Sequence, residues 1–278
     1  MPEPDGNAEI AAAVDSFSPW EKYWRVIAPI MLGVVCLAAW EAWVRLGEVP
    51  EYKLPAPSAI LATLRSEWPT LSVAWLVTLK TTLPAIGAAV IIGVALAVLF
   101  ASSRIVEVSL FPYAVMLQVT PLVALAPFVV IWIGWEHVWL TQLVCAWIVA
   151  FFPIVSNTAM GLRSADRGSR DLFALYGATG WQRLRLLLAP SALPYFLAGL
   201  KVSANLALVG AVVAEFVIGT QVDNPGLASM IFESQLRSDT STMFAALSLV
   251  SLTGIATFFI MQGLSFLLLR RWHESAVE

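Results

Sequence analysis

Apolar residues run in six long stretches along the chain, separated by short polar segments. Each stretch has about twenty or more mainly apolar residues, the length that an α-helix needs to cross the hydrocarbon core of a bilayer. The predicted spans lie near residues 26–46, 75–101, 106–134, 139–162, 191–219 and 241–270. The pattern predicts an all-α polytopic membrane protein with about six transmembrane helices.

The third stretch is interrupted by Pro112, Pro121 and Pro127. Proline removes a backbone donor and clashes with the preceding turn, so it kinks or breaks a helix. Two interpretations fit: one long kinked helix, or a shorter helix with a broken partner. We expect one kinked helix.

A short segment between the first two spans has a different character. In "YKLPAPSAILATLRSEW", Ile60, Leu61, Leu64 and Trp68 recur at helical spacing among charged residues. This pattern is typical of an amphipathic helix that lies at the membrane interface.

Composition supports a membrane protein, because 59% of the residues are hydrophobic and only 13% are charged. Soluble proteins carry roughly 25% charged residues. The sequence contains no basic patch of the kind that would bind nucleic acid, so we expect no nucleic-acid partner.

The first apolar run is too long for a cleaved signal peptide, and acidic residues precede it. We therefore predict that it remains as a span.

The distribution of Lys and Arg predicts the orientation. With the amino terminus inside, the inner segments hold ten of these residues: Lys22, Arg25, Arg104, Arg163, Arg167, Arg170, Arg183, Arg185, Arg270 and Arg271. Cytoplasmic loops are enriched in such residues. We therefore expect a cytoplasmic tail over 1–25, a transmembrane domain over 26–271 with a cytoplasmic loop at 163–190, and a carboxyl-terminal tail over 272–278.

That loop contains "DLFALYGATGWQRLRLLLAP", which predicts two short helices. Ser169 is the expected cap of the first helix, and Asp171 lies in its first turn, where the helix dipole favours a negative charge. Gly177 is expected to end this helix, since glycine adopts the left-handed conformation at little cost.

The second helix is predicted to start at a capping box formed by Thr179 and Gln182. We expect Pro190 and Pro194 to break it and to start the fifth span. The result is a compact helical knob that offers Phe173, Tyr176 and Trp181 to a cleft of another protein, because aromatic anchors dominate interface energy. Alternatively, the loop rests on anionic lipid headgroups.

The spacing of Asp171, Gly177 and Pro190 resembles the signature loop of the permeases of bacterial ABC importers. The segments "LPAPSAILATL", "TPLVALAPFVVIWIG", "FFPIVSNTAMGLRSADR", "ALPYFLAGLKVSANLALVGAVVAEFVIG" and "NPGLASMIFES" are similar, in the same order, to the nitrate/sulfonate/taurine-type group. The likeness covers residues from about 54 to 270. Asp171 stands in place of the usual glutamate, Leu172 and Phe173 stand where small residues are common, and Ala189 occupies a position often held by leucine.

The resemblance implies a multi-pass protein of the bacterial inner membrane that is not itself an enzyme and needs no cofactor. The chain lacks a G-x-x-x-x-G-K-[ST] stretch, so a separate ATP-binding cassette subunit must hydrolyse ATP. Other implied partners are an extracytoplasmic solute-binding protein, membrane lipid and a second permease copy, more economically a homodimer than a heterodimer. The residues expected to couple to the ATPase are Asp171, Leu172, Phe173, Leu175, Tyr176, Gly177, Ala178, Trp181 and Pro190.

Polar groups within the spans are candidates for the translocation path, because they are costly in lipid and face a cavity or another helix. The candidates are Gln118, Thr120, Asn157, Ser203, Asn205 and Glu215. Hydrogen bonds between helices explain such residues equally well. For Glu215 the alternatives are a place at the outer gate and a structural hydrogen bond to the following turn.

At the outer mouth, residues 223–226 are expected to form a turn and residues 227–236 a short helix, where the resemblance implies that the binding protein delivers substrate. A plain connecting loop fits each of these residues equally well. The substrate is either a vitamin-related heterocycle, such as a thiamine-pyrimidine precursor or riboflavin, or a sulfonate, nitrate or taurine-type anion. The scarcity of cationic residues in the spans favours the heterocycle.

Two other functional classes are weaker. A secondary transporter or channel would leave the cytoplasmic knob without a role. A membrane-embedded enzyme would need a nucleophile with its base, paired carboxylates or metal ligands at depth, and the two histidines, His137 and His273, lie outside the predicted spans.

Overall fold

The computed structural model describes residues 19–218 and 225–270, and every regular element in these residues is helical. The chain divides into two compact units, residues 1–62 and 63–278. The predicted tails lie outside the described residues, except that residues 19–25 already belong to the first helix. The all-α prediction is confirmed.

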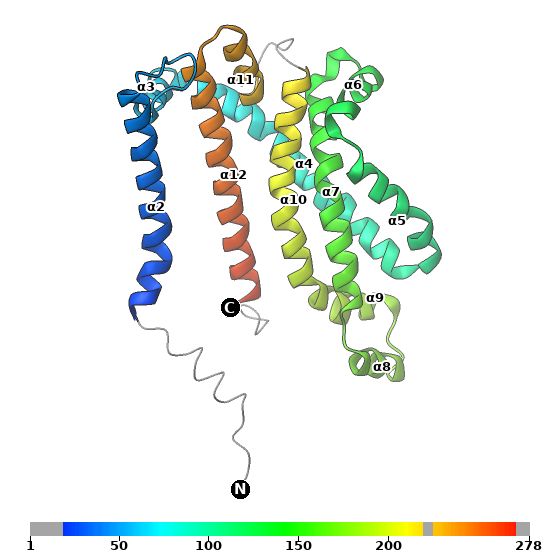
Figure 1. The fold of residues 1–278 in the computed structure, drawn as a ribbon. Helices are drawn as coiled ribbons and strands as arrows, with labels where there is room; N and C mark the ends of the chain where they lie inside the picture. Colours follow the sequence, from blue (N-terminus) through cyan, green and yellow to red (C-terminus); the bar gives the residue numbers. More distant parts are fainter. Residues whose placement is uncertain (1–18, 219–224, 271–278) are drawn as a thin grey trace. The chain divides into compact units, whose positions relative to one another are not determined.

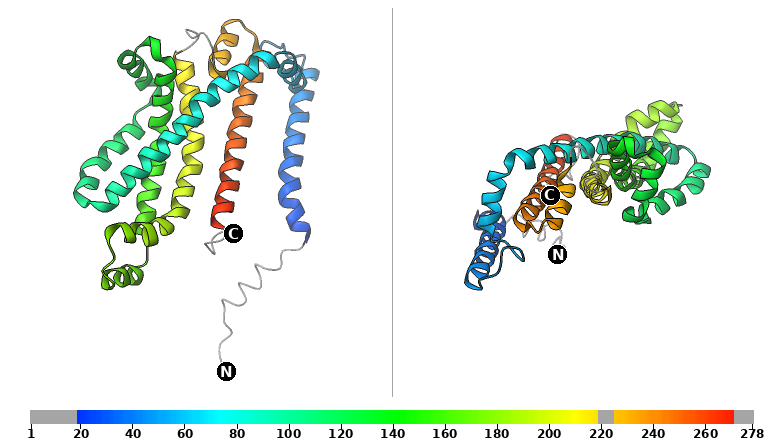
Figure 2. Two further views of the ribbon diagram at one scale, coloured as in Figure 1. Left: turned by 180° about the vertical axis from the view of Figure 1, so that it is seen from behind. Right: turned by 90° about the horizontal axis from the view of Figure 1, so that it is seen from above.

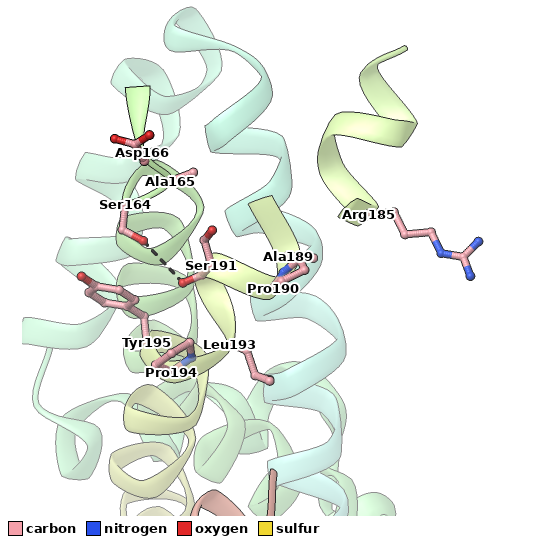
Figure 3. Close-up of a pocket in the computed structure, with 10 residues that line it drawn as sticks. All are labelled: Ser164, Ala165, Asp166, Arg185, Ala189, Pro190, Ser191, Leu193, Pro194 and Tyr195. Carbon is pink, nitrogen blue, oxygen red and sulfur yellow. Dashed lines mark hydrogen bonds between the residues drawn. The ribbon is translucent and has the colours of Figure 1, made fainter. Parts of the chain in front are cut away.

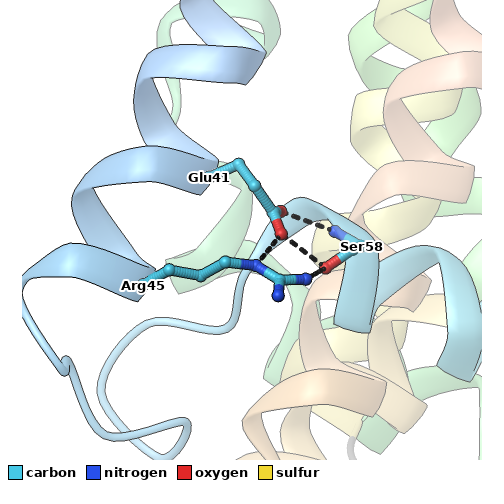
Figure 4. Close-up of polar contacts among 3 residues, drawn as sticks. All are labelled: Glu41, Arg45 and Ser58. Atoms are coloured by element: carbon cyan, nitrogen blue, oxygen red, sulfur yellow. Dashed lines mark hydrogen bonds and ion pairs between the residues drawn. The ribbon is translucent and has the colours of Figure 1, made fainter.

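The first unit contains α2 (Pro19–Leu46) and the start of α3 (Pro57–Ser66). The Ser58 backbone N–H and hydroxyl donate to the Glu41 carboxylate at 3.0 Å and 2.7 Å, as Figure 4 shows. Arg45 pairs with the same carboxylate, and its Nη2 donates to the Ser58 hydroxyl at 3.0 Å. Because the first N–H groups of a helix have no partner within it, Glu41 of α2 acts as a cap for α3.

The second unit is built from long membrane helices that meet through small residues. Its largest helices are α4 (Trp68–Ser102), α7 (Val138–Arg163), α10 (Ala189–Ile218) and α12 (Thr240–Leu269). Alanines at four-residue spacing are fully buried on α7 and α10, at Ala146, Ala150, Ala207 and Ala211. Small side chains let helix backbones approach closely, which is how membrane helices associate without a hydrophobic driving force.

Each end of this unit carries its own short helices. In Figure 1, α8 (Arg167–Leu175) and α9 (Gly180–Arg183) lie at the end where α7 and α12 finish. The opposite end holds α6 (Leu122–Ile133) and α11 (Leu227–Leu236), and the view from behind in Figure 2 agrees. The loop and the end of α12 thus share one side, as the charge pattern predicts.

The third predicted span is not one kinked helix. It consists of α5 (Arg104–Val119) and α6, which are bent by 104° at a short break. Thr120 is extended, with ψ of 125°, and the next residue is Pro121. A residue before proline is driven out of the helical region, so Pro121 breaks the span, whereas Pro112 and Pro127 remain inside helices.

Among the described residues, five helices are long and apolar enough to cross a membrane, and the bent pair makes a sixth if it counts as one span. The second span starts at Trp68, earlier than predicted. A helix is present in the segment predicted to lie at the interface, as α3, but Trp68 of that pattern begins α4; a helix is also present at 227–236, as α11. Asp223 and Asn224 of the predicted turn lie outside the described residues.

Candidate functional site

The loop between α7 and α10 is held in one conformation by its own hydrogen bonds. Its first helix, α8, is capped by Asp166, whose carboxylate accepts from the Ser169 N–H at 3.0 Å. The prediction of Ser169 as the cap was therefore wrong. Asp166 takes this role because it precedes Ser169 by three residues. Its side chain can therefore accept the Ser169 N–H, which has no partner within the helix, as an N-cap requires.

Gly177 ends α8 as predicted, with φ of +61°. The Ala178 N–H donates to the Phe173 carbonyl at 2.9 Å, and the Gly177 N–H donates to the Ala174 carbonyl at 3.1 Å. These two bonds form a Schellman motif, which requires a left-handed residue at the position of Gly177.

The predicted capping box is also present. The Thr179 hydroxyl accepts from the Gln182 backbone N–H, and the side-chain Oε1 of Gln182 accepts from the Thr179 backbone N–H at 2.8 Å. The reversal at Gly177 is thus followed at once by a capped helix start. Two successive terminal motifs leave the loop little freedom to rearrange.

Pro190 and Pro194 do not break the second helix, contrary to the prediction. After α9 the chain forms a π-helix, η2 (Leu184–Leu188), and continues directly into α10. The Ala189 N–H donates to the Leu184 carbonyl, five residues back. This wider turn accommodates the missing N–H and the bulk of Pro190, so the helix continues.

The loop exposes large side chains near its turn. Leu175, Tyr176 and Trp181 are 85%, 82% and 67% exposed, and Leu172 is also exposed. Phe173 and Ala178 are half-buried, Asp171 and Gly177 are exposed, and Pro190 lies half-buried at the start of α10. The predicted coupling residues other than Pro190 therefore all lie on the loop of α8 and α9, and most of them are exposed.

Pro190 instead lines a pocket of about 760 Å³ where the end of α7 faces the start of α10, together with Ser164, Tyr195 and others shown in Figure 3. The Ser164 hydroxyl is 2.8 Å from the Gly161 carbonyl and 3.4 Å from the Ser191 carbonyl. A second pocket, of about 770 Å³, lies between the loop and the end of α4 and is lined by Arg163, Arg170, Arg183 and Asp171 among others.

The candidate path residues are not gathered in one place. Gln118 and Thr120 are exposed where α5 ends, and the Thr120 hydroxyl donates to the Met116 carbonyl at 2.7 Å. Asn157 and Asn205 are half-buried, and Asn157 donates to the Pro153 carbonyl at 2.9 Å. Their place on the path remains a prediction.

Ser203 and Glu215 are fully buried within the second unit. The Ser203 hydroxyl donates to the Ala150 carbonyl of α7 at 2.6 Å. Glu215 Oε2 accepts the Ala228 N–H at 3.0 Å, in the first turn of α11. The adjacent Leu227 N–H donates to the Thr78 hydroxyl of α4 at 3.0 Å, so α10 and α4 together cap α11.

Sequence comparison identifies the family. Residues 89–272 match the model of the family described as "Binding-protein-dependent transport system inner membrane component". The chain is 31% identical over 250 residues to the formylaminopyrimidine transport permease protein ThiX of Halalkalibacterium halodurans, covering 90% of this chain and 97% of that protein. It is 34% identical over 252 residues to the riboflavin transport system permease protein RibX of Chloroflexus aurantiacus, covering 89% and 90%.

A more distant relative is the putative aliphatic sulfonates transport permease protein SsuC of Bacillus subtilis, 26% identical over 98% of this chain and 95% of that protein. Among solved structures, the fold is similar to a chain of an amino acid ABC transporter, with a TM-score of 0.60 and 17% identity over 76% of this chain and 97% of that one. The chain belongs to the binding-protein-dependent transport system inner membrane component family and is a multi-pass permease subunit of an ABC importer in the bacterial inner membrane.

Proposed function

We propose that the loop of α8 and α9 is the site at which a separate ATP-hydrolysing subunit docks and drives the membrane helices. The observation that carries this proposal is the exposed group Leu172, Leu175, Tyr176 and Trp181 on a loop held rigid by its own capping motifs. Apolar and aromatic side chains in water are costly unless a partner covers them. A rigid loop also transmits displacement, because it does not deform when its tip is moved.

We further propose that two copies of the chain form the translocation path. Tyr195, Val202, Val209 and Phe216 form an exposed stripe along α10, and the half-buried Asn205 lies on the same side of the helix. Exposed side chains along the whole length of α10 could contact the same helix of a second, symmetry-related copy, or could line a path between the two copies. A binding protein would deliver substrate near α11, at the opposite end from the coupling loop.

The proposed substrate is a vitamin-related heterocycle of the pyrimidine or flavin type. The relatives named for formylaminopyrimidine and riboflavin transport are 31% and 34% identical, each over about nine-tenths of this chain, against 26% for the Bacillus subtilis relative named for sulfonates. Lys80 and Lys201 are the cationic side chains away from the helix ends in α4, α7, α10 and α12. A path for anions would more naturally carry a larger number of cations.

Co-purification and uptake test the proposal together. The tagged chain, purified in mild detergent from its native membrane, should bring down an ATPase subunit. Vesicles with the reconstituted complex and its binding protein should accumulate formylaminopyrimidine or riboflavin only with ATP inside. Accumulation driven by an ion gradient without ATP would instead identify a secondary transporter, and ATP-driven uptake of sulfonates alone would overturn the proposed substrate class.

Replacement of Tyr176 by alanine is expected to weaken ATPase association by about 1 to 3 kcal/mol, because aromatic anchors at interface centres contribute this much. Binding of the purified ATPase to the detergent-solubilised permease measures the effect. Leu236 is similarly exposed, at 70%, but lies at the end of α11, so Leu236→Ala is the matched control and should leave the affinity unchanged. Equal affinities for the Tyr176 variant and the wild type would argue against docking at this surface.

A further inference from the structure

Polar contacts connect three helices in series at the end of the second unit that carries the coupling loop. Arg170 of α8 donates through Nη2 to the carbonyls of Arg163, at 2.7 Å, and Leu162, at 3.3 Å, in the last turn of α7. The side chain of Arg163 in turn pairs with Glu107 in the first turn of α5, with 2.5 Å between Nη2 and Oε1. The coupling loop is thereby joined to α7, and α7 to α5.

The first contact follows from helix chemistry. The last carbonyls of an α-helix have no partner within the helix, and a cation is favoured there by the helix dipole. Arg170 supplies both a donor and a positive charge to the end of α7. Any movement of α8 must therefore move the end of α7 or break this contact.

The second contact matters because α5 is lightly packed. Ala114 is the buried residue of this helix, and Phe111 makes ring contacts with Phe100 of α4 and Phe152 of α7 at centroid distances of 6.2 Å and 5.9 Å. With few buried side chains, α5 is held by these ring contacts and, at its start, by the ion pair. Beyond its far end lies the 104° bend into α6.

The ion pair between Arg163 and Glu107 is not explained by a contribution to the stability of the fold. The side chains of Arg163 and Glu107 are 44% and 15% exposed, and ion pairs at this degree of exposure contribute little to folding. A charged pair between two helices still fixes their relative position. An arginine and a carboxylate interact in a defined geometry, and this contact breaks when the two helices move apart.

We propose that Arg170, Arg163 and Glu107 are positioning residues that pass the displacement of the coupling loop to α5 and through it to the bent pair α5–α6. The inference rests on the proposed function of the loop, and it names the residues through which a displacement of the loop would reach the membrane helices. Without the Glu107–Arg163 pair, the ATPase should still bind and hydrolyse ATP, but the displacement of the coupling loop should no longer move α5.

The test uses the complete importer, with permease, ATPase and binding protein, reconstituted in vesicles. Substrate uptake and ATP hydrolysis are measured together for Glu107→Gln. The expected result is ATP hydrolysis close to that of the wild type with uptake per ATP lowered on the order of 5- to 10-fold, the lower range of typical coupling effects. The thermal unfolding midpoint should change little.

Arg104→Gln is the matched control. Arg104 pairs with the same carboxylate at 3.0 Å, but it lies on α5 itself, so its removal breaks no connection between helices. The charge swap Glu107→Arg with Arg163→Glu should restore at least half of the lost uptake per ATP, whereas each single change should not.

Three results would overturn the inference: unchanged uptake per ATP in Glu107→Gln, an equal loss in Arg104→Gln, or no recovery in the charge swap. Each of these is obtained with a complex that still binds its ATPase and transports, so the proposed function itself would survive. A wild-type chain that brings down no ATPase would instead overturn both the function and the route.

Discussion

Replacement of Gly177 by valine is expected to lower ATP-driven uptake by at least about tenfold while the permease still inserts in the membrane. The residue adopts φ of +61° in the Schellman motif that ends α8. A β-branched side chain in this region costs roughly 1 to 3 kcal/mol, so the loop would leave the conformation that presents Tyr176 and Trp181. Vesicle uptake and ATPase co-purification measure the effect.

Gly180 provides a control that separates backbone conformation from bulk. At both glycines an added Cβ would meet no atom within 4 Å, but Gly180 opens α9 without a positive φ. Gly180→Val should therefore retain most of the uptake. If the two variants lose activity to the same degree, the left-handed turn is not the reason, and the rigid-loop argument fails.

Replacement of Gly226 by alanine is expected to destabilise the second unit by about 1 to 3 kcal/mol, the usual cost of forcing an extra carbon into a packed site. Gly226 is extended, with φ of −80°, so its backbone suits any residue. The added Cβ, however, would overlap the carboxylate of the fully buried Glu215. That carboxylate would have to move and release the Ala228 N–H. Thermal unfolding in detergent measures the loss.

The control is Gly254→Ala in α12, where the new Cβ would lie at an ordinary contact distance of 3.6 Å from Leu208. Alanine is a better helix former than glycine, so this variant should be as stable as the wild type or more so. A second check combines Gly226→Ala with Glu215→Ala. The double variant should be less destabilised than the sum of the single ones, because the overlap is gone. Strict additivity would show that the two side chains do not compete for space.

Features that depend on a few neighbouring residues were accessible to prediction. The capping box of Thr179 and Gln182, the left-handed Gly177 and the helix Leu227–Leu236 all follow from local chemistry, and all are present. The cap of α8 was misplaced by three residues, because both Asp166 and Ser169 are good N-cap residues and sequence alone does not say which turn comes first.

Proline effects were predicted less well. Pro112, Pro121 and Pro127 all stand in apolar surroundings, yet only Pro121 interrupts its helix. Pro190 is accommodated by a π-helical turn that no local signal announces. A proline breaks a helix or is absorbed by it according to how neighbouring helices pack around the freed carbonyl, and that information is not local.

Side chains that act across helices were missed for the same reason. Arg163 and Glu107 are 56 positions apart in the sequence, and each alone has the appearance of an ordinary charge at a helix end. Glu215 was a candidate for the outer gate or for a structural hydrogen bond, and the structure places it fully buried beneath the start of α11. Its position on the transport path remains a prediction.

The sequence by itself determined that this protein is a helical membrane protein with a loop of defined turns ahead of α10, because hydrophobic length and capping chemistry act over single helices and short segments. The tertiary structure alone decided where the third span bends, which carboxylate caps α11 and which charges join the coupling loop to α5. These features depend on how helices approach one another, and small residues along α7 and α10 permit that approach without specifying its partners.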